Sequence, residues 1–100
     1  MLFALYVLDK PGTTKQRLEL KPAQYEHLGR VEDRMVTGGP LLAEDGETMI
    51  GSLLVIDFPN RAAAESWLAE APFTKGGVFE EATIHPYKQN WPRRRDVHDP

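Results

Sequence analysis

Apolar positions along the chain gather into four strand-like segments and two helix-like ones. The first segment, residues 2–8, is apolar throughout, as expected of a strand covered on both faces. Residues 9–14 contain proline and glycine and predict the turn that ends it. The last segment, residues 78–87, largely alternates apolar and polar positions and predicts a final strand.

The middle of the chain carries the pattern of a β-hairpin. Apolar residues at 41–42 and 50–58 flank a polar turn that contains Asp45–Gly46. Gly38–Pro40 is expected to open the first strand of the hairpin, and Gly51 lies inside the second. A glycine inside a strand predicts a bulge or a place where another group approaches the backbone closely.

A first helix is predicted to begin near Pro22, because a proline N–H is not needed in the first turn. The polar residues 15–20 before it are expected to form a loop, and the helix is expected to end before Gly38. One stripe of this helix, spaced at i, i+4, i+7 and i+11, is predicted to pack on the sheet; its members are Gln24, Leu28, Val31 and Met35.

A second helix is predicted over residues 61–70, with Asn60 as its N-cap and Pro72 beyond its end. Residues 73–77 are expected to form a short turn or one helical turn capped by glycine. The face predicted to be buried consists of Ala63, Ala64, Trp67 and Leu68.

The predicted order, β-α-β-β-α-β, is that of a ferredoxin-like α+β sandwich. Right-handed crossovers place both helices on one face of a four-stranded antiparallel sheet, with the first and third strands central. These two strands are apolar at nearly every position, so the other face also needs a cover. We therefore expect a homodimer in which two sheets face each other as a dimeric α+β barrel. The domain is expected to span residues 1–91, with a charged tail at 92–100.

Composition and charge exclude several classes of function. The chain has 100 residues, no cysteine and a net charge of −3, so it offers no thiolate chemistry and no general attraction for nucleic acid or anionic membranes. The apolar residues 2–8 are too few to span a bilayer and lack the basic flank of a signal peptide, which favours a cytoplasmic protein. The arginines at 93–95 have no matching basic face and are expected in a solvated or subunit-crossing tail.

Several short motifs follow one another in a specific order over residues 1–91. They are Arg17…Lys21-Pro22-Ala23, Gly39-Pro40-Leu41…Asp45-Gly46…Gly51-Ser52, Trp67 in the alanine-rich helix, Pro72-Phe73…Gly76-Gly77-Val78-Phe79 and Ile84-His85-Pro86-Tyr87-Lys88. In these motifs the chain resembles the YCII-related (YciI-like) family of small dimeric α+β-barrel proteins. The resemblance implies a ferredoxin-like fold, a dimer, and a cleft with a His–Asp pair as the proposed acid/base apparatus. It also implies small-molecule chemistry, since at least one relative acts on a chlorinated hydroxyquinol.

The chain departs from the family pattern at both positions of that pair. Gln24 stands where the resemblance places the histidine, and Ala71 stands where it places the aspartate. Glutamine does not exchange a proton at neutral pH, and alanine can neither orient nor charge a partner. The usual dyad is therefore missing.

Two histidines remain as candidates for acid/base work. His27 follows Gln24 by three residues and Glu70 adjoins the vacated aspartate position, so a relocated His27–Glu70 pair is one hypothesis. The alternative is that both side chains are solvent-exposed. His85, late in the last strand, is expected either to reach across a dimer interface or to be an ordinary edge-strand histidine. No two histidines have the spacing of metal ligands, so we expect no metal.

Other residues are candidates for binding a small ligand. Backbone amides beside glycine can bind an anion or polarise a carbonyl, and a serine adds a hydroxyl. Positive charge near the first helix would suit a carboxylate or phenolate ligand. The alternatives are that the glycines serve only the backbone conformation and that the cations lie on the surface. The candidate binding residues are Arg17, Lys21, Gln24, Gly39, Pro40, Gly51 and Ser52.

Two classes of function stay open on this basis. The first is a non-catalytic protein that binds a small carboxylated or hydroxylated metabolite in the cleft of a homodimer. The second is an isomerase, lyase or dehydrochlorinase-type enzyme in which His27 or His85 does the work of the lost histidine. The sequence has no phosphate-cradling glycine-rich loop, and we expect no bound cofactor in either case.

Overall fold

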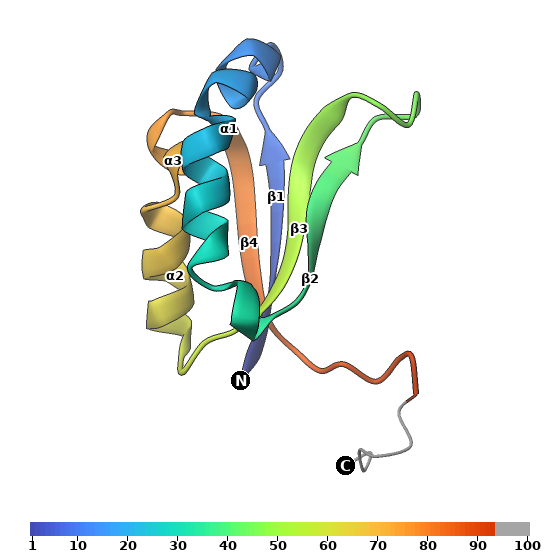
Figure 1. Cartoon of the computed structure of the whole chain (residues 1–100). Coiled ribbons are helices and arrows are strands. Elements are labelled where there is room, and N and C mark those ends of the chain that lie inside the picture. The colour runs from blue at the N-terminus through green and yellow to red at the C-terminus, as the bar shows by residue number, and fades with distance from the viewer. Residues whose placement is uncertain (94–100) are drawn as a thin grey trace.

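The structure, a computed structural model, describes residues 1–93 as a four-stranded sheet with a layer of helices (Figure 1). Residues 94–100, which include Arg94, Arg95 and His98 of the predicted tail, lie outside the described residues. The elements are β1 (Leu2–Asp9), α1 (Thr14–Gly29), the 3₁₀ helix η1 (Glu32–Arg34), β2 (Met35–Leu42), β3 (Met49–Asp57), α2 (Arg61–Ala69), α3 (Pro72–Lys75) and β4 (Phe79–Tyr87).

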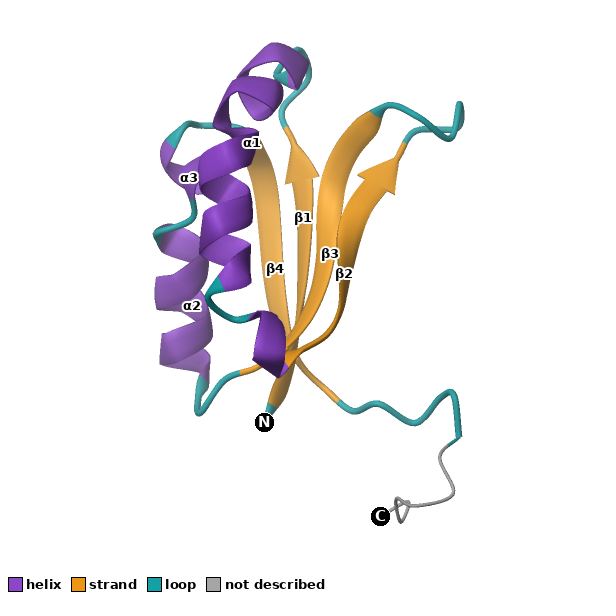
Figure 2. Ribbon diagram, in the orientation of Figure 1, coloured by secondary structure: helices purple, strands orange, loops and turns teal. Residues whose placement is uncertain are grey.

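The sheet has the strand order β2-β3-β1-β4, and every neighbouring pair is antiparallel. Strands β1 and β3 are therefore central, and the helices lie together on one face of the sheet (Figure 2). This arrangement confirms the predicted ferredoxin-like α+β fold. Among residues 1–93, no helix is long and apolar enough to cross a membrane.

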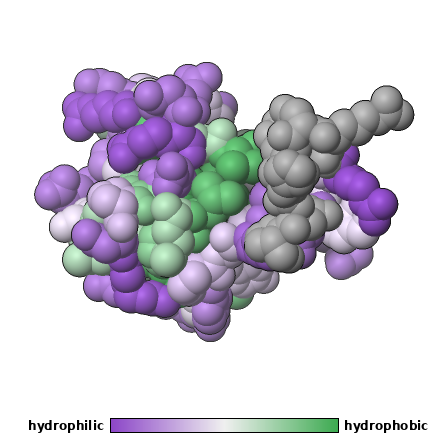
Figure 3. All heavy atoms as spheres, turned by 90° about the horizontal axis from the view of Figure 1, so that it is seen from below, coloured by the Kyte–Doolittle hydropathy of each residue, from purple (hydrophilic) through white to green (hydrophobic). Residues whose placement is uncertain are grey.

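The core lies between the central strands and α2. Phe3, Leu5 and Val7 of β1 point to the helix side and are almost fully buried. Their partners Ile56 and Leu54 on β3 share this side, because paired residues of an antiparallel sheet project to the same face. The predicted helix face is confirmed: Ala64 and Leu68 are buried, and Ala63 and Trp67 pack against them. Seen from below, hydrophobic side chains gather in the middle of this end of the molecule, with hydrophilic ones around them (Figure 3).

Two local predictions are confirmed in atomic detail. Asn60 caps α2, since its side-chain oxygen accepts a hydrogen bond from the N–H of Ala63 at 2.9 Å. The hairpin turns at Asp45–Gly46, where Gly46 has a φ of 72° that favours glycine. The Asp45 carboxylate accepts hydrogen bonds from the backbone N–H groups of Glu47 and Thr48, both at 2.9 Å, and from the Thr48 hydroxyl. A short Asx-type network therefore closes the turn.

The first helix begins and ends earlier than predicted: α1 ends at Gly29, so Val31 of the predicted stripe lies beyond it. The predicted loop at 15–20 is wrong: α1 begins at Thr14, so that Pro22 lies in its middle instead of its first turn. The polar residues had suggested a loop, but the side of α1 facing the sheet is itself polar, with Arg17, Gln24 and His27 buried. The N-terminal turns of α1 lie at an angle to the rest of the helix (Figure 1), as expected where a proline removes an i→i−4 hydrogen bond.

The second strand also begins earlier than predicted. Gly38–Pro40 does not open β2 but lies inside it, because pairing with β3 extends back to Met35. Met35 accordingly belongs to β2 instead of ending the first helix. The expectation that a strand glycine marks a close approach is confirmed at Gly51, where a Cβ atom would lie 2.1 Å from the backbone oxygen of Val7.

The sheet face opposite the helices is apolar at its centre. Tyr6 of β1 pairs with Leu53 of β3, and these side chains are 44% and 39% exposed. His85 of β4 is exposed and pairs with Ala4 of β1. Both residues project to this open face, because paired residues of an antiparallel sheet share a face. Among residues 1–93, no helix covers this side of the sheet (Figure 2).

Replacing Gly51 by alanine should destabilise the fold by about 2–3 kcal/mol, because the new methyl group collides with the β1 backbone, which cannot move aside. Urea unfolding at fixed protein concentration measures the loss. Gly39→Ala is the matched control, since nothing lies within 4 Å of a Cβ atom there, and its effect should stay within about 0.5 kcal/mol. Equal losses in the two variants would contradict the close approach.

The hydrogen bonds from Thr48 and Glu47 lower the pKa of Asp45 from 3.8 to about 2. Because the folded protein holds this proton less tightly than the unfolded chain, the turn's contribution to stability is full above the unfolded pKa of 3.8 and is lost as the pH falls toward 2. Carbon-13 NMR titration of the Asp45 carboxyl should show the low pKa, and Thr48→Val should raise it. A pKa near 3.8 in the native protein would refute the network.

Candidate functional site

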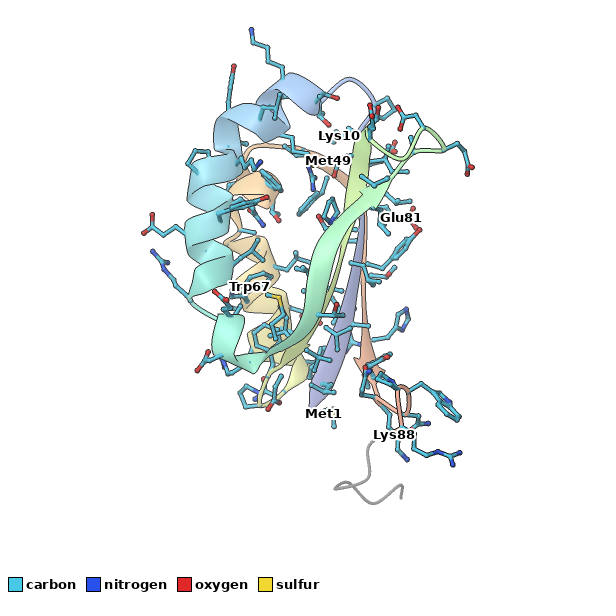
Figure 4. The ribbon with its side chains drawn as sticks, turned by 45° about the vertical axis from the view of Figure 1, so that its right-hand side comes forward. Met1, Lys10, Met49, Trp67, Glu81 and Lys88 are labelled. Atoms are coloured by element: carbon cyan, nitrogen blue, oxygen red, sulfur yellow. The ribbon has the colours of Figure 1, made fainter. Side chains whose placement is uncertain are left out.

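A cleft of about 420 Å³ opens between α1 and the β2–β3 part of the sheet. In Figure 4, side chains from the helix layer and the sheet project into the space between the two, with Met49 near its hairpin end and Trp67 farther along the helices. The cleft wall is mostly apolar, with a few polar groups. It is lined by Arg17, Leu18, Lys21, Gln24, Tyr25, Leu28, Gly29, Glu32, Met35, Gly38, Gly39, Pro40, Met49, Ser52, Leu54 and Phe73.

Arg17 is the most highly connected polar residue of this cleft. Its Nη1 donates to both carboxylate oxygens of Asp9, at 3.1 and 2.8 Å, and its Nη2 donates to the Gly51 carbonyl at 3.2 Å and to Ser52 Oγ at 3.1 Å. The guanidinium also lies over the Phe73 ring, 4.7 Å from its centroid. One side chain of α1 thus contacts the end of β1, the start of β3 and α3.

The Arg17–Asp9 ion pair is almost fully buried, with side-chain exposures of 9% and 6%. Burial raises the pKa of the Asp9 carboxyl, and the attraction and hydrogen bonds of Arg17 oppose that rise without cancelling it. Most of the charge of Arg17 is therefore already matched within the protein. Lys21, at the cleft wall, holds its ammonium 5.2 Å from the centroid of the Tyr25 ring.

Gln24 occupies the position where the resemblance places a histidine, and it is only 5% exposed. Its side-chain oxygen accepts a hydrogen bond from the backbone N–H of Phe73 at 3.0 Å. Phe73 belongs to α3, whose N-cap is the fully buried Ala71, in the position of the family's aspartate. The two dyad positions thus hold the side-chain amide of Gln24, which is hydrogen-bonded to the backbone, and the methyl group of Ala71.

His27 lies behind the cleft and is not one of its lining residues. It is 8% exposed, its ring stacks on Trp67 at a centroid distance of 4.6 Å, and its Nε2 lies 2.9 Å from the Trp67 carbonyl oxygen. A carbonyl only accepts, so this Nε2 carries the hydrogen and is not a free base. Glu70, the C-cap of α2, is exposed, and the described residues show no ion pair between it and His27.

The remaining candidates divide between the two sides of the sheet. Gly39, Pro40 and Ser52 line the cleft together with Lys21, whereas Gly51 contributes only its carbonyl, to Arg17. His85 lies on the open face of the sheet, away from the cleft. In the described part of the chain, no group of three or more histidine or acidic side chains is placed to hold a metal ion.

Sequence reasoning did not identify two residues that shape the site. Asp9 was assigned to the turn after the first strand, and Phe73 to a turn after the second helix, yet both contact Arg17. An acidic residue that ends an apolar strand just before an arginine-containing helix is a usable signal for such a pair. Phe73 had no comparable signal, because its contact depends on the packing of α3 against α1.

Comparisons with known proteins agree with this architecture. The chain is 30% identical over 96 residues to the protein YciI of Escherichia coli O6:H1 (strain CFT073), covering 89% of this chain and 98% of that one. Among solved structures, it is similar to the 5-chloro-2-hydroxyhydroquinone dehydrochlorinase TftG of Burkholderia phenoliruptrix AC1100, in complex with 2,5-dihydroxybenzoquinone. That similarity has a TM-score of 0.81 and 28% identity, over 88% of this chain and 94% of the other.

A more distant likeness supports the fold alone. The crystal structure of an antibiotic biosynthesis monooxygenase matches with a TM-score of 0.50 and 18% identity, over 85% of this chain and 94% of the other. The model of the YCII-related domain matches residues 1–88, nearly the whole described chain. The chain therefore belongs to the YCII-related domain family, as its motifs had suggested.

Proposed function

We propose that this protein binds a small, planar, carboxylated or hydroxylated metabolite in the cleft between α1 and the sheet, without the acid/base chemistry of a His–Asp pair. The observation that carries the proposal is the combination of an intact cleft with Gln24 and Ala71 at the dyad positions. A cleft of about 420 Å³ is large enough for a single substituted ring, and mostly apolar walls with a few polar groups are typical of ligand sites.

The similar TftG structure supports the ligand class, since that protein is described in complex with 2,5-dihydroxybenzoquinone. The cleft of the present chain offers comparable chemistry from its own residues. Phe73 and Tyr25 provide aromatic surface for a ring, and Lys21 provides positive charge for an ionised oxygen. Arg17 contributes less charge than its type suggests, because Asp9 matches it.

The second candidate is a dehydrochlorinase-type enzyme, favoured by the similarity to TftG. In this chain the reaction would need an acid or base from His27 or His85. Neither histidine lines the cleft: His27 stacks on Trp67, and His85 lies on the other side of the sheet. For these reasons binding is the function that we place first.

We further propose that a second copy of the chain covers the open face of the sheet. Tyr6 and Leu53 leave an apolar centre there, and central strands that are apolar on both sides are typical of buried sheets. A homodimer with the sheets face to face would also place His85 at the interface.

The ligand proposal predicts that 2,5-dihydroxybenzoquinone binds saturably in the cleft. In a nitrogen-15 NMR titration, the largest shifts should fall on the amides of Gln24, Gly38 and Ser52, which line the cleft. Tyr6 and His85, on the open face, serve as internal controls and should move little. Absence of binding, or shifts confined to the open face, would contradict the proposal. Chloride release from 5-chloro-2-hydroxyhydroquinone would favour the enzyme instead.

The dimer proposal predicts a solution mass of twice the 11.3 kDa chain. Leu53→Glu should shift this mass toward the monomer, because it places a charge at the centre of the apolar face. Leu18→Glu is the matched control: Leu18 is 59% exposed on α1, away from the sheet face, and its substitution should leave the dimer intact. Light scattering after size-exclusion chromatography measures both masses. A native monomer, or a dimer that survives Leu53→Glu, would refute this interface.

A further inference from the structure

One polar group of the cleft has its hydrogen-bonding direction fixed from behind, and a second has its hydroxyl hydrogen left to donate. Gln24 uses its amide oxygen to accept from the Phe73 N–H, so its NH₂ group is the end left for the cleft. Ser52 Oγ accepts from Arg17 Nη2, and a guanidinium can only donate. The hydroxyl hydrogen of Ser52 is therefore left to be donated elsewhere, and the described residues show no hydrogen bond donated by Ser52 Oγ.

These two groups belong to one connected unit. Gln24 bonds to the backbone of Phe73, the Phe73 ring packs under the Arg17 guanidinium, and Arg17 bonds to Ser52. The Gly51 carbonyl, which would otherwise offer an acceptor beside Ser52, is occupied by Arg17 Nη2. Gln24 cannot turn its oxygen toward the cleft without breaking its buried hydrogen bond to the Phe73 N–H, whereas Ser52 Oγ keeps one lone pair that can still accept.

The charged residues of the cleft favour the same kind of ligand. Lys21 carries an ammonium, which only donates, and Glu32 is the single carboxylate among the described lining residues. Unlike a histidine at the same position, Gln24 keeps its donor at every pH at which the protein is folded. The cleft thus presents donors from Gln24, Ser52 and Lys21, and Glu32 is the one described lining carboxylate that could accept from a ligand.

We infer that Gln24 Nε2–H, as a fixed donor, and Ser52 Oγ–H, as a second donor, form a recognition site for the oxygen acceptors of a ring ligand, namely a carboxylate, a phenolate or a quinone carbonyl. This inference rests on the proposed binding function and narrows its ligand class. Ligand groups that only donate, such as an amidinium or an ammonium, are disfavoured because they would leave the Gln24 donor without an acceptor. The replacement of histidine by glutamine thus changes the site from proton transfer to acceptor recognition.

Benzoate and benzamidinium are matched probes for this inference, because they share a shape but present only acceptors and only donors, respectively. By calorimetry, the native protein should bind benzoate at least about tenfold more tightly than benzamidinium. Gln24→Glu keeps the acceptor for the Phe73 N–H but removes the donor, and should reverse the preference. Ser52→Ala removes the other donor without a change of charge and should weaken benzoate about fivefold.

Lys21→Gln is the control for general charge, since it also makes the cleft more negative by one unit while leaving the Gln24 and Ser52 donors in place. It should weaken benzoate but retain the preference for benzoate over benzamidinium. Ser52→Ala keeps the test decisive if Gln24→Glu does not fold, as judged by thermal unfolding.

The possible failures are distinguishable. If the native protein binds both probes equally, or if Lys21→Gln abolishes the preference as fully as Gln24→Glu, recognition by the Gln24 and Ser52 donors is wrong, although the cleft still binds a ring. If neither probe nor 2,5-dihydroxybenzoquinone binds in the cleft, the proposed function fails together with it.

Discussion

The buried Arg17–Asp9 ion pair is the interaction on which the geometry of the cleft depends. Two opposite charges with side-chain exposures below 10% are costly to desolvate, and removing one partner of such a pair typically costs about 3–5 kcal/mol. The pair therefore holds α1 against the end of β1 at a fixed height along the sheet. Because the same guanidinium also bonds Gly51 and Ser52, that height sets the position of β3 relative to the helix.

The polarity of the site follows from this arrangement. Arg17 has its Nη donors engaged by protein acceptors, so it orients Ser52 instead of being a free cation for a ligand. Gln24 is oriented in the same way by the backbone of Phe73. The chain lacks the dyad that the family resemblance implies, and hydrogen bonds to the Phe73 backbone and from Arg17 orient the polar groups that are present. The function proposed above follows from this: such a site would hold a ligand instead of moving a proton.

Much of the fold was predictable from the sequence, because its signals are local. Alternation and apolar runs located the strands, Asp45–Gly46 located the hairpin turn, and Asn60 located the start of α2. The beginning of α1 was not predictable from the same signals. The buried face of α1 consists of Arg17, Gln24 and His27. Because these residues are polar, they give no hydrophobic periodicity from which the helix could be predicted.

The candidate site was predictable as a set of lining residues but not as a network. Gln24, Ser52 and Lys21 do line the cleft, whereas the partners that fix their roles, Asp9 and Phe73, depend on tertiary packing. His27 shows the same limit. Its spacing from Gln24 suggested a place at the mouth of the cleft, but stacking on Trp67 holds it behind the wall.

The most direct test is a crystal structure of the protein with benzoate bound. We predict carboxylate oxygens within about 3.2 Å of Gln24 Nε2 and of Ser52 Oγ, with Arg17 still paired to Asp9. A carboxylate bound directly by Arg17, with the Asp9 pair broken, would contradict the view that this ion pair is the fixed frame of the site. Benzoate on the open face of the sheet would contradict the cleft itself.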